Sequence, residues 1–213
     1  MVTVTMMNTK NSPKRHAVVA IASIIGAGAM YFMGYRTGVI LGAISYVLLF
    51  LTVVIGPILV VFPRLRRRLT GEFPFNWRSE LGIWFVIWAV VHVAYIVDNP
   101  GNIDVLWRSS WGFTATVATV LAVLVLFTSN TKAFSYMGAK AWKWHQSHAT
   151  YIIFYLLSAH IWQFSTVIGN RPDDPVHYLY LIMFFLVMLL HLVGFIKVIR
   201  FYNQNGKYPS YIR

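Results

Sequence analysis

Six long stretches of this chain carry no charged side chain, and they constrain the fold more than any other feature of the sequence. They cover residues 17–35, 37–63, 81–97, 109–131, 144–170 and 175–196. An α-helix rises about 1.5 Å per residue, so roughly 20 residues cross the ~30 Å hydrocarbon layer of a bilayer. Each stretch is long enough to do so, or nearly so. With 58% hydrophobic and only 11% charged residues, the sequence predicts an all-α membrane protein, a bundle of six transmembrane helices.

The distribution of basic residues predicts how this bundle is oriented. Fifteen of the 18 lysines and arginines fall before the first stretch, after the sixth, or in the two connections on the same side. The other side has only Arg36, Arg108 and Arg171. Loops rich in lysine and arginine stay in the cytoplasm, so both termini are predicted to be cytoplasmic. The net charge of +12 is then explained by topology and by anionic lipid headgroups, and nucleic-acid binding is not expected.

The remaining sequence leaves little room for a second domain. We expect a cytoplasmic segment at residues 1–16, the six-helix domain at 17–200, and a short cytoplasmic tail at 201–213. The tail is too short to fold around a flavin or nicotinamide, so such chemistry requires a partner. No cleavable signal peptide is expected, because the first stretch is followed by Tyr35 and Arg36 and not by a small-residue cleavage site. The absence of cysteine excludes disulfides, iron–sulfur clusters and thiolate ligands.

Five of the seven histidines lie deeper within the apolar stretches than the other two. They are His92, His145, His148, His160 and His191. The other two, His16 and His177, lie at predicted helix ends and are interpreted as interfacial residues. Ionisable side chains are costly inside a membrane and usually mark a functional site. A single buried histidine is usually just a hydrogen-bonded core residue, but five in one small bundle indicate a cofactor site.

Two of these histidines are predicted to share a depth. The third and fifth helices both run outward, which places His92 and His160 in the outer half of the membrane. Neutral imidazoles from two neighbouring helices can coordinate one haem iron from opposite faces. The flat macrocycle packs well between apolar helices. The pair therefore predicts a b-type haem.

A second, inner cofactor site is expected nearer the cytoplasm. Arg78 lies 14 residues before His92, about 21 Å lower on nearly the same helix face. It could meet a haem propionate, a flavin phosphate or only a lipid headgroup. His145, His148 and His191 lie at similar inner depth. His191 could complete a ligand pair with His148, although for His191 and His145 a simple hydrogen bond to a neighbouring helix is the alternative.

Several segments resemble one known family. The run "RSELGIWFVIWAVVH" at 78–92 is similar to the third helix of the ferric reductase-like transmembrane domain family. Further similarity lies in "RTGVI", "VIGPILVVFPRLRRRL", "LFTSNTKAF" and "WHQSHATY", so that the resemblance extends over residues 35–165. The branch it most resembles contains the haem-binding membrane subunits of bacterial periplasmic methionine sulfoxide reductase systems. The resemblance implies haem ligation by His92, His148 and His160.

The chain departs from the pattern of this family at the inner site. His148 and His160 are 12 residues apart, one fewer than is usual in the family, and neither His145 nor His191 is a family feature. Members of the family differ in this region too, with a second haem, a flavin or no inner cofactor. The sequence therefore predicts one or two haems, with a flavin as the alternative occupant of the inner site.

The function expected from these features is one-electron transfer across a membrane, as the electron-transfer subunit of an oxidoreductase. The donor would be a cytosolic flavoprotein reductase or membrane quinol, and the acceptor an extracytoplasmic reductase or another acceptor. The expected location is the bacterial inner membrane, in contact with its lipids. The alternative is a multi-pass transporter or assembly subunit with structural or proton-relay histidines. Proton relays usually include carboxylates, and no Asp or Glu lies in any of the six stretches.

Overall fold

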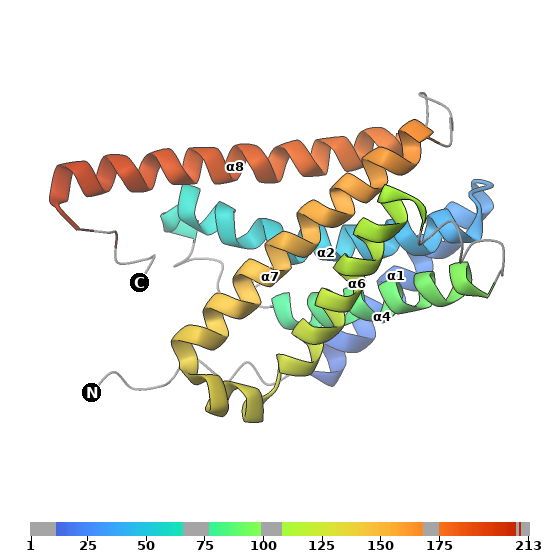
Figure 1. Ribbon diagram of the computed structural model, residues 1–213, viewed down its shortest axis with the longest axis horizontal. Helices are drawn as coiled ribbons and strands as arrows, with labels where there is room; N and C mark the ends of the chain where they lie inside the picture. Colours follow the sequence, from blue (N-terminus) through green and yellow to red (C-terminus); the bar gives the residue numbers. More distant parts are fainter. Residues whose placement is uncertain (1–11, 66–76, 99–107, 168–174, 208, 210–213) are drawn as a thin grey trace.

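The computed structural model describes residues 12–65, 77–98, 108–167, 175–207 and 209. Within these ranges the chain forms helices and no strand. The helices are α1 (Pro13–Phe32), α2 (Thr37–Val61), α4 (Arg78–Val97), α6 (Ser110–Thr128), α7 (Thr131–Val167) and α8 (Pro175–Asn205) (Figure 1). The all-helical fold predicted from the sequence is thus confirmed.

Five of these helices are long and apolar enough to cross a membrane, namely α1, α2, α4, α6 and α8. The sixth predicted span falls on α7, which is not among them, so six spans are not confirmed. Helix α7 has 37 residues, with a bend at Gly138, whose φ of 74° interrupts the helix. Its three histidines, its glutamines and its tyrosines make the part after the bend less apolar than the other spans. The polar side chains that suggested a cofactor site are the same ones that weaken the signal for a span.

Helices α1 and α4 begin earlier than the charge pattern predicts. Helix α1 begins at Pro13, a residue favoured in the first helical turn because it has no N–H to leave unpaired. Helix α4 begins at Arg78 and therefore includes Glu80, which is only 1% exposed. The expectation that no acidic residue lies within a span is therefore wrong for α4. The last helix also differs from the prediction, because α8 continues to Asn205.

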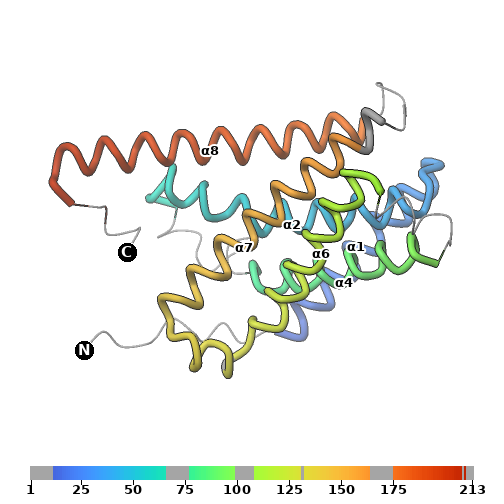
Figure 2. The backbone as a smooth tube through the Cα atoms, viewed as in Figure 1, coloured from blue at the N-terminus to red at the C-terminus, as the bar shows by residue number. Residues whose placement is uncertain are grey.

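Helix α2 lies at the centre of the fold and packs against α1, α4, α7 and α8. Its Leu49 and Val53 are fully buried, whereas the other helices expose large apolar side chains over much of their length. Helices α6 and α7 pack along one another and cross the α2–α4 pair obliquely, as the tube in Figure 2 shows. Exposed Leu, Ile and Phe side chains around a buried central helix are the arrangement expected of a bundle surrounded by lipid.

Basic residues gather at one end of the bundle, which we call the basic end. Its described members are Lys14, Arg15, Arg64, Arg78, Lys132, Lys140, Lys143, Lys197, Arg200 and Lys207. At this end α1 and α4 begin and α2, α6 and α8 finish (Figure 1). Arg36 and Arg108 lie at the opposite end, where α2 and α6 begin. The asymmetry follows the predicted topology, although the cytoplasmic location of the basic end stays a prediction.

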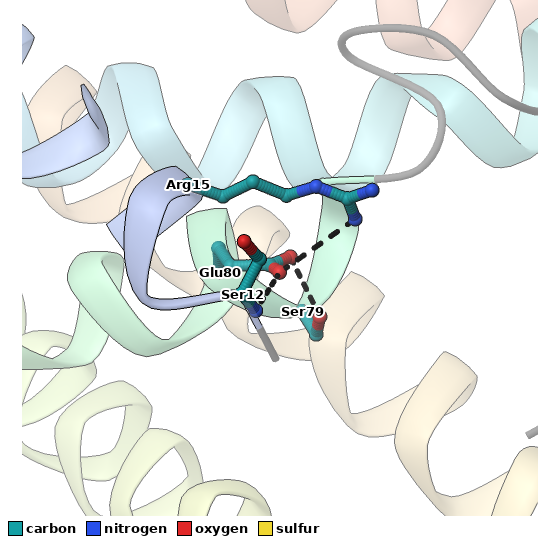
Figure 3. A network of polar contacts seen from close by, with 4 residues as sticks. All are labelled: Ser12, Arg15, Ser79 and Glu80. Atoms are coloured by element: carbon teal, nitrogen blue, oxygen red, sulfur yellow. Dashed lines mark hydrogen bonds and ion pairs between the residues drawn. The ribbon is translucent and has the colours of Figure 1, made fainter. Parts of the chain in front are cut away.

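A buried carboxylate joins two helices at the basic end. Glu80 of α4 accepts a hydrogen bond from the backbone N–H of Ser12 at 3.4 Å and from the Ser79 hydroxyl at 2.8 Å. The guanidinium of Arg15, on α1, lies 3.8 Å from the same carboxylate (Figure 3). A charge that is removed from water needs such partners. Glu80 therefore ties the start of α1 to the start of α4.

Candidate functional site

His92 and His160 both lie in the half of the bundle away from the basic end. His92 lies in the last third of α4, where its ring faces α2. A Cβ atom added to Gly42 would lie 3.4 Å from Cε1 of this ring, so the imidazole occupies the space that glycine leaves. His92 also interacts with the backbone of Gly38, and electrostatically with His160 of α7. The two histidines that the sequence predicted to share a depth thus lie within electrostatic reach of one another, on helices α4 and α7, which do not pack directly against each other.

The orientation of His160 is set by helix α6. Its Nδ1 lies 2.8 Å from the carbonyl oxygen of Trp111, which can only accept, so Nδ1 carries the proton. The lone pair of the neutral ring is then on Nε2. This is the usual arrangement of a metal-binding histidine, whose second ring nitrogen donates to a carbonyl or carboxylate. Ser109, which accepts from the Gly112 N–H at 3.1 Å, caps the turn that contains Trp111.

Unpartnered ring nitrogens mark one face of α4 beside this pair. Nε1 of Trp84, Nε1 of Trp88 and Nδ1 of His92 are buried and have no hydrogen-bond partner among the described residues. The spacing of four residues places these three side chains on one helix face. Buried polar atoms without partners are uncommon in native proteins and call for a missing ligand, ion or water. The two indole rings also provide the flat apolar surface on which a macrocycle packs.

These residues fit a haem better than a bare metal ion. A metal ion without a macrocycle usually needs three or more protein ligands, and within the described ranges no three histidine or acidic side chains gather in this way. A haem iron needs only one or two axial ligands from the protein, because the macrocycle supplies the others. His92 and His160 would be those axial ligands.

Two residues assigned to the inner site converge on a tyrosine that the sequence interpretation missed. Tyr151 of α7 interacts electrostatically with Arg78. Its ring also packs edge-on against His191 of α8, with the centroids 4.6 Å apart. Nδ1 of the same histidine lies 3.1 Å from the Tyr155 hydroxyl. The Tyr151 hydroxyl lies only 2.5 Å from where a Cβ of Gly56 would be. Tyr151 thus contacts His191 and lies within electrostatic reach of Arg78.

The other two inner histidines are not part of this cluster. Nε2 of His145 lies 3.1 Å from the Thr128 hydroxyl, which joins the beginning of α7 to the end of α6. His148 is exposed, its ring stacks on Trp144 at 4.5 Å, and its Nδ1 donates to the Trp144 carbonyl at 2.8 Å. Like His160, His148 therefore has its lone pair on Nε2. Its hydrogen bonds and ring contacts within the described part of the chain stay on α7.

Some contributors to the site had a signal in the sequence and others had none. Gly38 and Gly42 are four residues apart on α2, a spacing of small residues that permits close approach of a neighbouring helix. Trp84 and Trp88 share the four-residue spacing with His92. By contrast, Trp111 acts through its carbonyl oxygen, which every residue possesses, so no sequence pattern distinguishes it.

The apolar helices around a buried centre define the chain as an integral, multi-pass, all-helical membrane protein. No protein-family model matches its sequence, and no curated protein matches it. The resemblance to the ferric reductase-like family therefore stays a prediction that rests on the motifs and on the site described above.

Proposed function

We propose that the protein is a b-type haem electron-transfer subunit of a ferric reductase-like oxidoreductase. Two observations carry this proposal: His92 and His160 lie within electrostatic reach of one another, and the Trp111 carbonyl holds the proton of His160 on Nδ1. Two neutral imidazoles from neighbouring helices are the ligand set of membrane-bound haem b. A bound haem would supply the one-electron couple.

The protein's own residues would position and insulate that couple. The Trp111 carbonyl fixes the ring of His160 and makes its Nε2 more electron-rich, which strengthens it as a ligand. Gly42 leaves the space in which the His92 ring lies. The indole rings of Trp84 and Trp88 exclude water, and their N–H groups are suited to the oxygen atoms of a propionate. A dry site with fixed ligands tunes the reduction potential.

The inner site is the proposed entry point for electrons. Arg78, Tyr151 and His191 form its polar core, and Arg78 is suited to a propionate or a phosphate. Its occupant is a second haem, with His148 or His191 as ligand, or a flavin. His145, assigned to this site from the sequence, is better suited to joining α6 and α7 through Thr128.

The proposed route runs from the basic end to the opposite end of the bundle. The donor is a cytosolic flavoprotein reductase or quinol, and the acceptor is an extracytoplasmic reductase or another acceptor. We place the protein in the bacterial inner membrane with the basic end in the cytoplasm. There its lysines and arginines would contact anionic lipid headgroups.

A proton-linked transporter or an assembly subunit is the second candidate, and Glu80 is the observation that favours it. A buried carboxylate within α4 provides the acidic group that such a transporter needs. Against it, Glu80 already contacts Arg15, Ser12 and Ser79, which gives it a structural role.

Haem content separates the two candidates. Protein expressed with excess haem precursor and purified in detergent should show a Soret band and a b-type pyridine haemochrome. His92→Ala and His160→Ala should each remove this haem component. His16→Ala, a histidine in the first turn of α1, is the matched control and should retain it. A colourless wild-type protein, or full haem in both site variants, would reject the proposal; flavin extraction from the same samples identifies the inner occupant.

A further inference from the structure

A cavity lies between α7 and α8, apart from the histidine pair. Its volume is about 780 Å³, within the range of about 300–1,000 Å³ typical of small-molecule sites. Neither His92 nor His160 lines it. Six of its 13 lining residues are large aromatic residues, namely Tyr46, Tyr155, Trp162, Tyr180, Phe184 and Phe185. The cavity is therefore a site for a flat, largely apolar molecule.

The rim of this cavity faces the surroundings of the bundle. Trp162 is 52% exposed and Phe185 is 61% exposed, and both contribute to the lining. On the inner side, Tyr46 of α2 is only 2% exposed and forms the floor. Because α7 and α8 are lipid-facing helices in the proposed topology, a ligand would enter sideways from the bilayer. It must therefore be soluble in lipid.

Polar groups at defined positions distinguish the cavity from a gap for a lipid chain. The Tyr46 hydroxyl lies 2.7 Å from Oγ of Ser158, and Ser158 donates in turn to the Phe154 carbonyl at 2.7 Å. On the same lining, Nδ1 of His177 is buried and has no hydrogen-bond partner among the described residues. A hydrocarbon chain would leave this nitrogen unsatisfied, whereas a ring with oxygen substituents would pair with it.

We propose that the cavity between α7 and α8 binds the ring of a lipid-soluble quinone or quinol. Its oxygen would hydrogen-bond to His177, its ring would lie among the aromatic side chains, and its apolar tail would leave past Phe185 into the bilayer. Aromatic pairs add a favourable ring–ring interaction to simple burial of apolar area. A hydrogen-bonding nitrogen, an aromatic lining and an opening to the bilayer together match a quinone. An acyl chain would need only the apolar lining and the opening.

The cavity is adjacent to the proposed haem site across one helix. Ala159 and Ile161 line the cavity, and His160 lies between them on α7. A ligand in the cavity would thus be about one helix width, about 10 Å, from the histidine pair. A role as electron donor rests on the proposed function. A quinol bound here would become quinone by losing two electrons, one at a time, to the haem and two protons to the outer aqueous phase, and the inner site would then be the entry point only for a flavoprotein donor.

Binding is tested directly, without any measurement of electron transfer. Purified protein in lipid nanodiscs would be illuminated with a photoreactive azidobenzoquinone that has a decyl tail, and the labelled peptides identified by mass spectrometry. We expect label on α7 and α8 around Ala159 and Tyr180, displaced by decylubiquinone. Ala159→Phe fills the cavity and should abolish labelling. Ala139→Phe, on an exposed position of the same helix, is the matched control and should not.

The role of His177 is tested in the same assay. His177→Ala should weaken quinone binding about tenfold, the cost of one hydrogen bond to a buried group. His177→Gln, which keeps a hydrogen-bonding group, should restore much of the affinity. Labelling outside α7 and α8, unchanged labelling of Ala159→Phe, or equal displacement by a saturated fatty acid would overturn the proposal, and the last result would identify a lipid-chain site.

The haem-site variants separate this proposal from the proposed function. His92→Ala, lacking haem, should still be labelled in the cavity as the wild type is. If the wild type contains haem but no label appears between α7 and α8, the quinone site is rejected while the haem function stands. If labelling occurs in a protein that never binds haem, the proposed function fails and the quinone site remains.

Discussion

Nδ1 of His160 lies 2.8 Å from the carbonyl oxygen of Trp111, so the first turn of α6 orients a histidine of α7. The same oxygen accepts from the Thr114 hydroxyl at 2.9 Å. The carbonyl belongs to the backbone, so its position depends on how well the start of α6 is formed. The geometry of the proposed haem ligand is therefore tied to the stability of a helix end on its neighbour.

The cap of α6 provides the first prediction. Ser109→Ala removes the acceptor that binds the Gly112 N–H and should lower the stability of the protein by about 1 kcal/mol. Fraying of this turn would also loosen the Trp111 carbonyl and shift the reduction midpoint of the haem. Thermal unfolding and redox titration measure the two effects. Ser129→Ala, at the other end of α6, should leave the midpoint unchanged; an equal shift in both variants would contradict this coupling.

The space at Gly42 provides the second prediction. A methyl group there would meet the His92 ring at 3.4 Å, an ordinary contact distance, so Gly42→Ala should retain haem. Gly42→Leu should displace the ring and lower haem affinity at least about tenfold, as expected for overpacking by about 1–3 kcal/mol. Haem content per protein measures this difference. Gly28→Leu is the control, because a Cβ at Gly28 meets nothing within 4 Å.

The all-helical fold could be predicted from the sequence, because it depends on the length and periodicity of the apolar stretches. Uncharged length identifies a span, and the rise per residue gives the depth of His92 and His160. The start of α4 could not be predicted in this way. Glu80 is stable inside the helix only because Arg15 and Ser12, 65 or more residues earlier in the chain, lie beside it. A span that is delimited by charged residues excludes Glu80, because this rule assumes that every charged side chain is exposed to solvent.

The inner site was harder to predict for a similar reason. Depth alone grouped His145, His148 and His191, but the rotation of each helix decides which neighbour a side chain meets. His145 faces α6, His148 is exposed, and His191 meets two tyrosines of α7. Tyrosine near a membrane interface is common, so Tyr151 carried no signal until its contacts were seen.

The close approach of Gly56 and Tyr151 provides the third prediction. Gly56→Ala places a methyl group 2.5 Å from the Tyr151 hydroxyl and should destabilise the protein by about 1–3 kcal/mol. In a Tyr151→Phe background the hydroxyl is absent, and the nearest ring atom, Cζ, lies at an ordinary 3.8 Å. The same substitution should then cost almost nothing. Chemical denaturation of the four proteins gives the coupling energy, and additive effects would refute the contact.

Glu80 provides the last prediction. Glu80→Ala removes the acceptor for the Ser12 N–H and the Ser79 hydroxyl, and the partner of Arg15. Unsatisfied buried donors each cost about 1–3 kcal/mol, so unfolding of Glu80→Ala should be markedly easier. Glu80→Gln keeps an oxygen acceptor and should lose less, because Arg15 is 28% exposed and stays hydrated. Both variants should retain haem, since the contacts of Glu80 lie at the basic end, far from His92. Equal unfolding of Glu80→Ala and wild type would show that the network does not hold α1 to α4, and loss of haem in Glu80→Gln would link the carboxylate to the redox site.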